Sequence, residues 1–506
     1  MQQLTGIDTL FLTQETERTP LHIAPLMIYD PSTAPNGMVR FKDILKLFES
    51  RLHRAPIFRR KLYEVPFNLD YPYWVEAEDF DLEFHVRHIA LPKPGDWRQL
   101  CIQVARLHSR VLDRSRPLWE AYVIEGLDNI EGLPKGSFAL LLKMHHAAID
   151  GISGVEIIGA IHDTEPVPPQ RESGRAREWR PDRRPSGIGL LGRAYVNNVL
   201  QPARFAQTVG ELFPAVQRVR SGLREHRFRT IEEKVNTRFN ARVSGHRVVD
   251  GRFFDLEEIK TIKERVPGAT VNDVVVTIVA GALRKYLAAR GEIPSASLVA
   301  GAPINVRTEA DRGSGGNLVS MMTLSLYTDI ADPLERLHQV HDECVSSKEY
   351  ANAVGARTLT DLTQTIPPRI AALGFRAASQ MMLVTGAKSP INTIISNVPG
   401  PQIPMYLCGA RLVCSAGCGP IMDHMGLFHA VLSYEGGISI SIVSCREMMP
   451  DPAFYAECLQ DSFEELKNAA AQLERNRSRA LAGRKSAARG RSTGPRSARR
   501  SRRSAA

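Results

Sequence analysis

Apolar positions in the first third of the chain recur with two spacings, one helical and one typical of strands. In residues 41–52 and again in 97–111, apolar side chains return every three or four positions, which predicts helices that pack on a core by one face. Residues 82–89 alternate apolar with polar, the period of a half-buried strand. Residues 138–144 are apolar at almost every position and predict a strand buried on both faces. A helix is expected at 151–161, so the pattern indicates a mixed α/β unit.

A second α/β unit is predicted between residues 239 and 474. Residues 272–283 read as a buried helix whose N-terminal signal is Asn272 or a neighbour. A final helix is expected at 452–473. The strands are expected at 297–302, 320–327, 391–397, 411–414, 427–434 and 438–443. We expect the last three strands to form an antiparallel set, with Glu435-Gly436-Gly437 as a hairpin turn.

The composition between and after these units differs from theirs. Arginine and proline dominate from about residue 167 to 189, so a packed core is not expected there, and residues 190–229 read as a helical extension. Residues 475–506 contain Arg, Lys, Ser, Ala and Gly in a tail that we expect to be disordered. The predicted organisation is an N-terminal half at 1–166, a linker and extension at 167–238, a C-terminal half at 239–474 and the basic tail.

Charge and cysteine usage narrow the class of protein. The net charge is +10, but the tail carries 12 of the 65 basic residues and none of the 55 acidic ones, so the rest of the chain is close to neutral. This argues against a nucleic-acid-binding fold and leaves an acidic membrane surface as the anionic partner that the tail suits best. Seven dispersed cysteines and an opening without a signal-peptide pattern suggest free thiols in the cytoplasm, and no apolar stretch is long enough to span a bilayer.

Two adjacent histidines follow the predicted buried strand and are the strongest candidates for chemistry. His145 and His146 stand where that strand ends, Asp150 follows four residues after His146, and Gly151 lets the chain turn into the next helix. A histidine can accept a proton and return it near neutral pH. Metal binding is the alternative, but no glutamate occupies the HExxH position, and Cys408, Cys414 and Cys418 lack the spacing of a zinc site.

The HHxxxDG segment resembles the signature of the coenzyme-A-dependent acyltransferases. Further segments resemble the bacterial wax ester synthase/diacylglycerol acyltransferase family, in matching order over residues 1 to about 470. They are Leu4-Thr5-Gly6-Ile7-Asp8-Thr9-Leu10-Phe11-Leu12 with Thr19-Pro20-Leu21-His22-Ile23, Arg116-Pro117-Leu118-Trp119-Glu120, Asn272-Asp273-Val274, Pro303-Ile304-Asn305-Val306-Arg307 with Gly316-Asn317, and Ser396-Asn397-Val398-Pro399-Gly400-Pro401. Asn305 is a departure, since a small hydroxyl residue is expected there more often.

This resemblance implies two chloramphenicol-acetyltransferase-like domains with a tunnel between them. It implies acyl-CoA as donor substrate, diacylglycerol or a long-chain alcohol as acceptor, no cofactor and no metal. His146 is then the base and His145 supports it, while Asp150 and Gly151 shape the turn. The residues associated with substrate binding are Pro117, Leu118, Trp119, Asn272 and Asp273. Asn272 and backbone N–H groups near Gly151 are candidate donors to an oxyanion.

Several alternatives stay open from the sequence. Pro117, Leu118 and Trp119 could form only a turn and a core anchor, and Asn272 could be only a helix cap. His22, His85 and His88 are expected at the surface or in packing rather than in the site. The acceptor could be another lipid or polyketide-derived alcohol, and a non-catalytic protein that binds lipid bodies is a further class.

Overall fold

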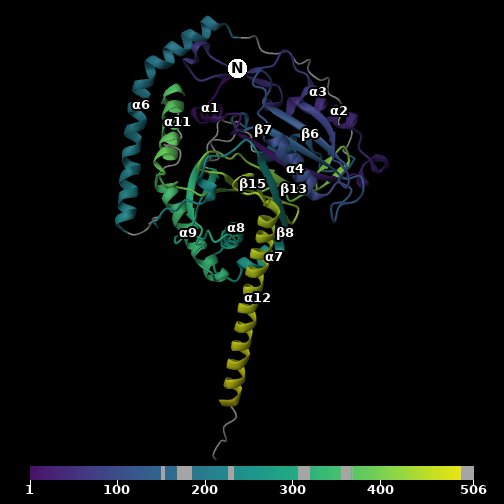
Figure 1. Ribbon diagram of the computed structural model, residues 1–506, viewed down its shortest axis with the longest axis vertical. Helices are drawn as coiled ribbons and strands as arrows, with labels where there is room; N and C mark the ends of the chain where they lie inside the picture. The colour runs from purple at the N-terminus through teal and green to yellow at the C-terminus, as the bar shows by residue number, and fades with distance from the viewer. Residues whose placement is uncertain are drawn as a thin grey trace, which may run out of the picture.

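The fold contains two six-stranded sheets, a small three-stranded sheet and helices that cover them (Figure 1). The three-stranded sheet is formed by β1 (Gln2–Gln3), β4 (Tyr73–Glu76) and β3 (Arg60–Tyr63). The expectation of a mixed helix-and-sheet fold is confirmed. The computed structural model describes residues 1–149, 154–167, 185–225, 229, 233–305, 319–354, 366 and 368–491.

The first large sheet is built around the strand that precedes the two histidines. Its order is β12 (Tyr406–Leu407), β13 (Ala410–Cys418), β2 (His22–Asp30), β7 (Phe138–His145), β6 (Trp119–Glu125) and β5 (Val86–Ala90). All eight residues of β7 are buried, as its continuous apolar run predicts. The prediction of a strand at 82–89 is correct only for its second half, which lies in β5. Leu82–His85 instead form the short helix α3. The Asp81 side chain caps this helix by accepting the backbone N–H groups of Glu83 and Phe84.

The second large sheet differs from the predicted antiparallel set. Its order is β10 (Val319–Ser325), β9 (Val299–Asn305), β11 (Thr393–Val398), β14 (Leu427–Tyr434), β15 (Gly437–Cys445) and β8 (Arg247–Asp255). The β14–β15 hairpin forms where it was predicted, and its turn uses positive φ angles at Glu435 and Gly436. However, β11 runs parallel to β14, and the segment predicted as strand 411–414 lies in β13 of the other sheet. Residues 406–418 therefore lie in the first sheet, although their position in the sequence places them in the C-terminal half, which begins at residue 239.

The principal helices predicted from apolar spacing are present with small changes in their bounds. They are α2 (Phe41–Arg51), α4 (Trp97–His108), α5 (Gly154–Ile161) and α8 (Val271–Ala288). The N-cap of α8 is Thr270 rather than Asn272, and Thr270 forms a capping box with Asp273. Of the predicted extension, α6 (Gly187–Arg224) is described, while linker residues 168–184 lie outside the described residues. The remaining helices are α7 (Leu256–Lys263), α9 (Pro333–Val354) and α11 (Pro368–Thr385).

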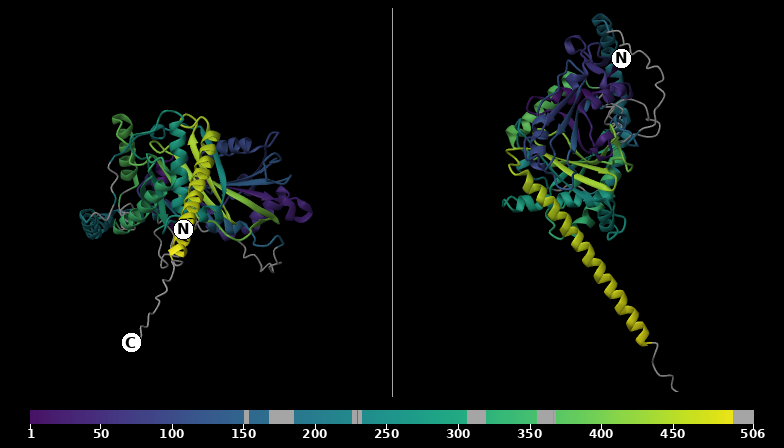
Figure 2. Two further views of the ribbon diagram at one scale, coloured as in Figure 1. Left: turned by 90° about the horizontal axis from the view of Figure 1, so that it is seen from below. Right: turned by 90° about the vertical axis from the view of Figure 1, so that its right-hand side faces the viewer.

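The last helix is longer than predicted. α12 spans Pro452–Arg491, so it continues beyond residue 473 into the tail that we expected to be disordered. Its first turns pack against α8, and the rest extends away from the body of the molecule (Figures 1 and 2). The alanine, arginine, lysine and leucine residues of 475–491 have high helix propensity, which explains why a helix forms without a core to pack on. Residues 492–506 lie outside the described part of the chain.

One apolar core spans both halves and holds the two large sheets together. It includes Leu26 and Leu141 of the first sheet, Leu100 of α4, and Val275 and Ile440 of the second half. Among the helices that the structure describes, none has the length and apolar character needed to cross a membrane.

Candidate active site

The two adjacent histidines are held by the backbones of two neighbouring segments. β7 ends at His145, and His146–Ala148 continue as the single turn η6. The backbone N–H of His145 donates to the carbonyl oxygen of Leu118 at 3.0 Å, and that of His146 donates to the carbonyl oxygen of Leu21 at 2.9 Å. Both main-chain positions are therefore fixed by the chain segments on either side of β7.

His146 is half-buried, and its imidazole packs flat on an aromatic ring. The ring of Phe11, from helix α1 (Gly6–Gln14), lies 4.0 Å from it between centroids, with an interplanar angle of 17°. Burial, and secondly the nearby His145, lowers the pKa of His146 to about 4. The imidazole is therefore neutral at neutral pH and able to accept a proton, as a general base requires.

The imidazole of His145 is fully buried. Its Nδ1 accepts a hydrogen bond from the backbone N–H of Ala147 at 3.1 Å. A backbone nitrogen can only donate, so Nδ1 of His145 carries no proton, and the proton of the neutral ring sits on Nε2. That Nε2 lies 3.4 Å from Oε1 of Glu15. His145 thus contacts the turn that carries His146, and its supporting role in the site stays a prediction.

Glu15 and His22 belong to this buried cluster, and sequence reasoning missed both. The Nε2 of His22 lies 3.1 Å from Oε1 of Glu15, and His22 is paired with His145 across β2 and β7. His22 had been expected at the surface or in packing. Thr5 and Asp8 form a capping box at the start of α1, and this Thr-x-x-Asp pattern is the sequence signal that would have predicted the helix.

The pKa of Glu15 reflects its partners more than its burial. Burial alone would raise the pKa of this carboxyl group, but the neighbouring imidazoles of His145 and His22 outweigh it and hold the pKa well below the usual range. Burial lowers the pKa of His22 to about 4 despite the neighbouring Glu15. The cluster therefore contains an ionised carboxylate beside a buried imidazole that resists protonation.

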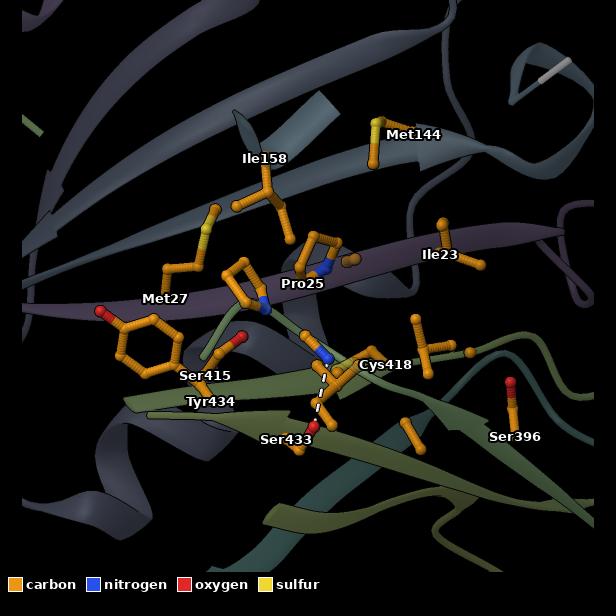
Figure 3. A pocket seen from close by; sticks show the side chains of 18 of the residues that line it. Ile23, Pro25, Met27, Met144, Ile158, Ser396, Ser415, Cys418, Ser433 and Tyr434 are labelled. Atoms are coloured by element: carbon orange, nitrogen blue, oxygen red, sulfur yellow. Dashed lines mark hydrogen bonds between the residues drawn. The ribbon is translucent and has the colours of Figure 1, made fainter. Parts of the chain in front are cut away.

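An apolar cavity lies between the two large sheets, next to the end of β7. It encloses ≈ 870 Å³ of empty space, counted with its mouth to solvent. Met144 and Ile158 lie on one side, and Ser396 and Ser433 on the other, with Pro25 of β2 between them (Figure 3). Met144 is two residues before His146. The apolar character of this lining suits an aliphatic chain.

The Pro117-Leu118-Trp119 segment supports the site without lining this cavity. Trp119 is fully buried, donates its indole N–H to the carbonyl oxygen of Phe58 at 3.1 Å, and stacks on His85 at 4.6 Å. Leu118 is also fully buried, and its carbonyl oxygen holds the backbone of His145. These contacts are those of core anchors, and a role in substrate binding stays a prediction.

Asn272 and Asp273 lie at the N-terminal end of α8. The Oδ1 of Asn272 accepts from the Nδ2 of Asn397 at 3.1 Å, which joins it to the 396–401 loop on the cavity wall. Asp273 accepts from the backbone N–H of Thr270 and lies 2.9 Å from Nδ1 of His341, so it ties α8 to α9. The structure therefore brings together two segments that the sequence placed 125 residues apart.

Some predicted features lie outside the described residues. Asp150 and Gly151 are among them, as are Val306-Arg307 and Gly316-Asn317. Asn305 is the last residue of β9. Within the described ranges, no group of three His, Cys, Asp or Glu side chains is arranged to hold a metal ion.

Comparison with known proteins assigns the family. The model of the wax ester synthase/diacylglycerol acyltransferase catalytic domain matches residues 4–275, and that of the C-terminal domain of the same family matches residues 315–467. The chain belongs to the wax ester synthase/diacylglycerol acyltransferase family. It is therefore an acyltransferase, and its two family segments cover both halves of the fold.

Relatives of this family member cover nearly the whole chain. A putative diacylglycerol O-acyltransferase of Mycobacterium tuberculosis is 33% identical over 92% of this chain and 90% of its own length. A second putative diacylglycerol O-acyltransferase of that species is 32% identical over 92% of this chain and 99% of its own. The family resemblance read from the sequence motifs is thus confirmed.

Solved structures agree with the fold. The wax ester synthase/diacylglycerol acyltransferase from Marinobacter aquaeolei is 26% identical, with a TM-score of 0.62 over 93% of this chain and 100% of its own. A trichothecene 15-O-acetyltransferase from Fusarium sporotrichioides has a TM-score of 0.57 over 92% of this chain and 95% of its own, at 11% identity, and shows the fold alone. The two-domain acyltransferase architecture implied by the motifs is confirmed.

Proposed function

We propose that this acyltransferase makes triacylglycerol from diacylglycerol and acyl-CoA, and that long-chain alcohols serve as second acceptors to give wax esters. The observation that carries the proposal is the neutral imidazole of His146, a half-buried residue that directly follows a buried strand whose Met144 lines an apolar cavity. The names of the relatives and the family support the choice of diacylglycerol.

The reaction needs one base and no covalent acyl-enzyme. The imidazole of His146 removes the proton of the acceptor hydroxyl as its oxygen attacks the thioester carbonyl carbon, and a C–O bond forms. The tetrahedral intermediate then collapses, the C–S bond breaks, and the imidazolium returns its proton to the departing CoA thiolate. The products are the ester and free CoA. Such general base catalysis contributes about 10²- to 10⁴-fold to the rate.

The cysteine on the cavity wall is poorly suited to act as a nucleophile. Cys418 lines the cavity, and burial raises the pKa of its thiol to about 12. A thiol attacks a thioester as its thiolate, which Cys418 forms only in trace amounts at neutral pH. This supports direct transfer from acyl-CoA to the alcohol. Asn272 and backbone N–H groups near Gly151 remain the proposed donors to the oxyanion.

Peripheral docking on a membrane or lipid-body surface belongs to the same proposal. Large apolar side chains are exposed on two helices, with Ile188, Tyr195 and Val199 on α6 and Leu373 and Val384 on α11. Apolar side chains of this kind suit insertion into a lipid interface, and the basic residues after 475 suit its anionic headgroups. Diacylglycerol resides in such a surface, so docking would give the enzyme access to its acceptor.

An acceptor panel tests the proposed reaction. The full chain is incubated with palmitoyl-CoA and dioleoylglycerol, hexadecanol or both, and the lipid products are separated while released CoA thiol is counted. We expect triacylglycerol with dioleoylglycerol, wax ester with hexadecanol, and more triacylglycerol than wax ester in direct competition. Thiol release that requires neither acceptor, or ester formation only with a different alcohol, would contradict the assigned acceptors.

A further inference from the structure

A single buried carboxylate connects several parts of the site. Glu15 directly follows the last residue of α1, and its side chain is 3% exposed. Its Oε1 lies 3.4 Å from Nε2 of His145 and accepts the backbone N–H of Leu21 at 3.1 Å. Its Oε2 accepts from the guanidinium of Arg114 at 2.9 Å. The two oxygens thus face different partners.

The first connection runs through the side chain of His145. Because Nδ1 of His145 accepts from the N–H of Ala147, the proton of the neutral ring is on Nε2, which lies 3.4 Å from Oε1 of Glu15. The carboxylate therefore places a negative charge beside the protonated nitrogen of His145. The ring in turn fixes Ala147, which is the residue after the base and lies inside the η6 turn.

The second connection runs through the backbone of Leu21. Glu15 accepts the N–H of Leu21, and the carbonyl oxygen of the same residue accepts the N–H of His146 at 2.9 Å. Glu15 thus reaches the catalytic turn by two routes, at the N–H of His146 through Leu21 and at the N–H of Ala147 through His145. α1 adds a third contact, because Phe11 stacks on the ring of His146.

We propose that Glu15 is a positioning residue for acyl transfer, whose carboxylate holds the His146 turn in its reactive geometry through His145 and Leu21. This inference rests on the proposed role of His146 as the base. In this proposal Glu15 acts through His145 and Leu21 and not on the substrate. Its effect is therefore expected on the rate of the bound complex, since misplacing a catalytic group by about 1 Å can cost about 10²-fold in rate.

Kinetics of conservative and drastic variants test the proposal. Glu15→Gln keeps the shape of the side chain but removes the charge, and we expect kcat to fall about 10-fold while KM for palmitoyl-CoA stays within about twofold. Glu15→Ala should lose about 100-fold in kcat. The matched control is Asp250→Asn, which neutralises a carboxylate that is 2% exposed and accepts the indole N–H of Trp97 in the other half. Its kcat should stay near that of the wild type.

A readout independent of turnover completes the test. Hydrogen exchange of peptides covering 138–149 should speed up at least about tenfold in Glu15→Gln, and stay unchanged in Asp250→Asn, because the turn loses its anchor. If exchange in this segment is unchanged in Glu15→Gln, the proposal is wrong whether or not the protein acylates the chosen acceptor. If the wild type is active, a Glu15→Gln protein with wild-type kcat also overturns it. A wild type without transferase activity would instead contradict the proposed function. The hydrogen-exchange measurement would still decide whether Glu15 holds the turn.

Discussion

At the scale of single residues, the three histidines of the site differ in their surroundings. His146 has one face on Phe11 and is partly exposed, His145 is buried with both ring nitrogens directed at named partners, and His22 is buried beside Glu15. The sequence could predict that the adjacent pair carries the chemistry, because two histidines after a buried strand are rare by chance. It could not predict Glu15 or His22, because their role depends on where α1 and β2 lie relative to β7.

The pH dependence of catalysis follows from the surroundings of His146. Burial lowers its pKa to about 4, so the basic form needed for catalysis persists as the pH falls well below the ordinary histidine value of 6.5. We expect kcat/KM for acyl transfer to vary less than about twofold between pH 5.5 and 8. Initial rates across this range check it, with circular dichroism to confirm that the protein stays folded. A fall in kcat/KM at acid pH with a midpoint near the ordinary histidine pKa of 6.5 would contradict the assigned environment of His146.

At the scale of elements, α1 is the support of the catalytic turn. Phe11 on this helix contacts the base, Glu15 directly after it contacts His145, and a capping box of Thr5 and Asp8 begins it. Helices with a clear apolar face, such as α4 and α8, could be predicted from spacing alone. The sheet to which β13 belongs could not be predicted from the sequence. The spacing of apolar residues in a strand indicates which faces are buried, but not which strand lies alongside.

Removing the cap of α1 should therefore impair catalysis. The Oγ1 of Thr5 accepts the backbone N–H of Asp8 at 3.2 Å, and Thr5→Ala removes this bond at a cost of about 0.5–2 kcal/mol. We expect kcat to fall about 3- to 10-fold, because Phe11 and Glu15 become less fixed. The control is Thr237→Ala, which removes the capping box of η7 (Arg238–Asn240). Equal kcat losses in the two variants would contradict the special role of α1.

At the scale of the whole molecule, two α/β halves share one core, and the second half contributes strands β12 and β13 to the first sheet. The division into halves at 1–166 and 239–474 was predicted from the repeated pattern of strands and helices, whereas the match to the catalytic-domain model at 4–275 runs past this boundary into the second half. The crossing of residues 406–418 into the first sheet was not predicted, and it interlocks the halves: Arg18 of the first half also pairs with Asp423, just beyond β13. The helical part of the tail was predicted to be disordered because its sequence shows no apolar face. Its residues nevertheless have high helix propensity.

Buried histidines in both halves predict a loss of stability in mild acid. Burial lowers the pKa of His22, His146 and His162 to about 4 and that of His429 to about 3. Between about pH 4 and 6.5 the unfolded chain binds more protons than the folded one, so stability rises with pH there and falls as the medium is acidified. Each such histidine contributes a slope of up to about 1.4 kcal/mol per pH unit. Thermal unfolding should show a lower Tm at pH 5 than at pH 7, and an equal or higher Tm would contradict it.

The most direct test of the account replaces the base. Purified wild type, His146→Ala and His88→Ala are compared for acceptor-dependent release of CoA thiol from palmitoyl-CoA with dioleoylglycerol, and the ester product is resolved. His88 is a partly exposed histidine of the same half, stacked on Phe41 away from the cavity lining, and serves as the matched control. We expect His146→Ala to lose about 10²- to 10⁴-fold in rate and His88→Ala to keep the wild-type rate. Equal ester formation by His146→Ala and the wild type would contradict the assignment of His146 as the base.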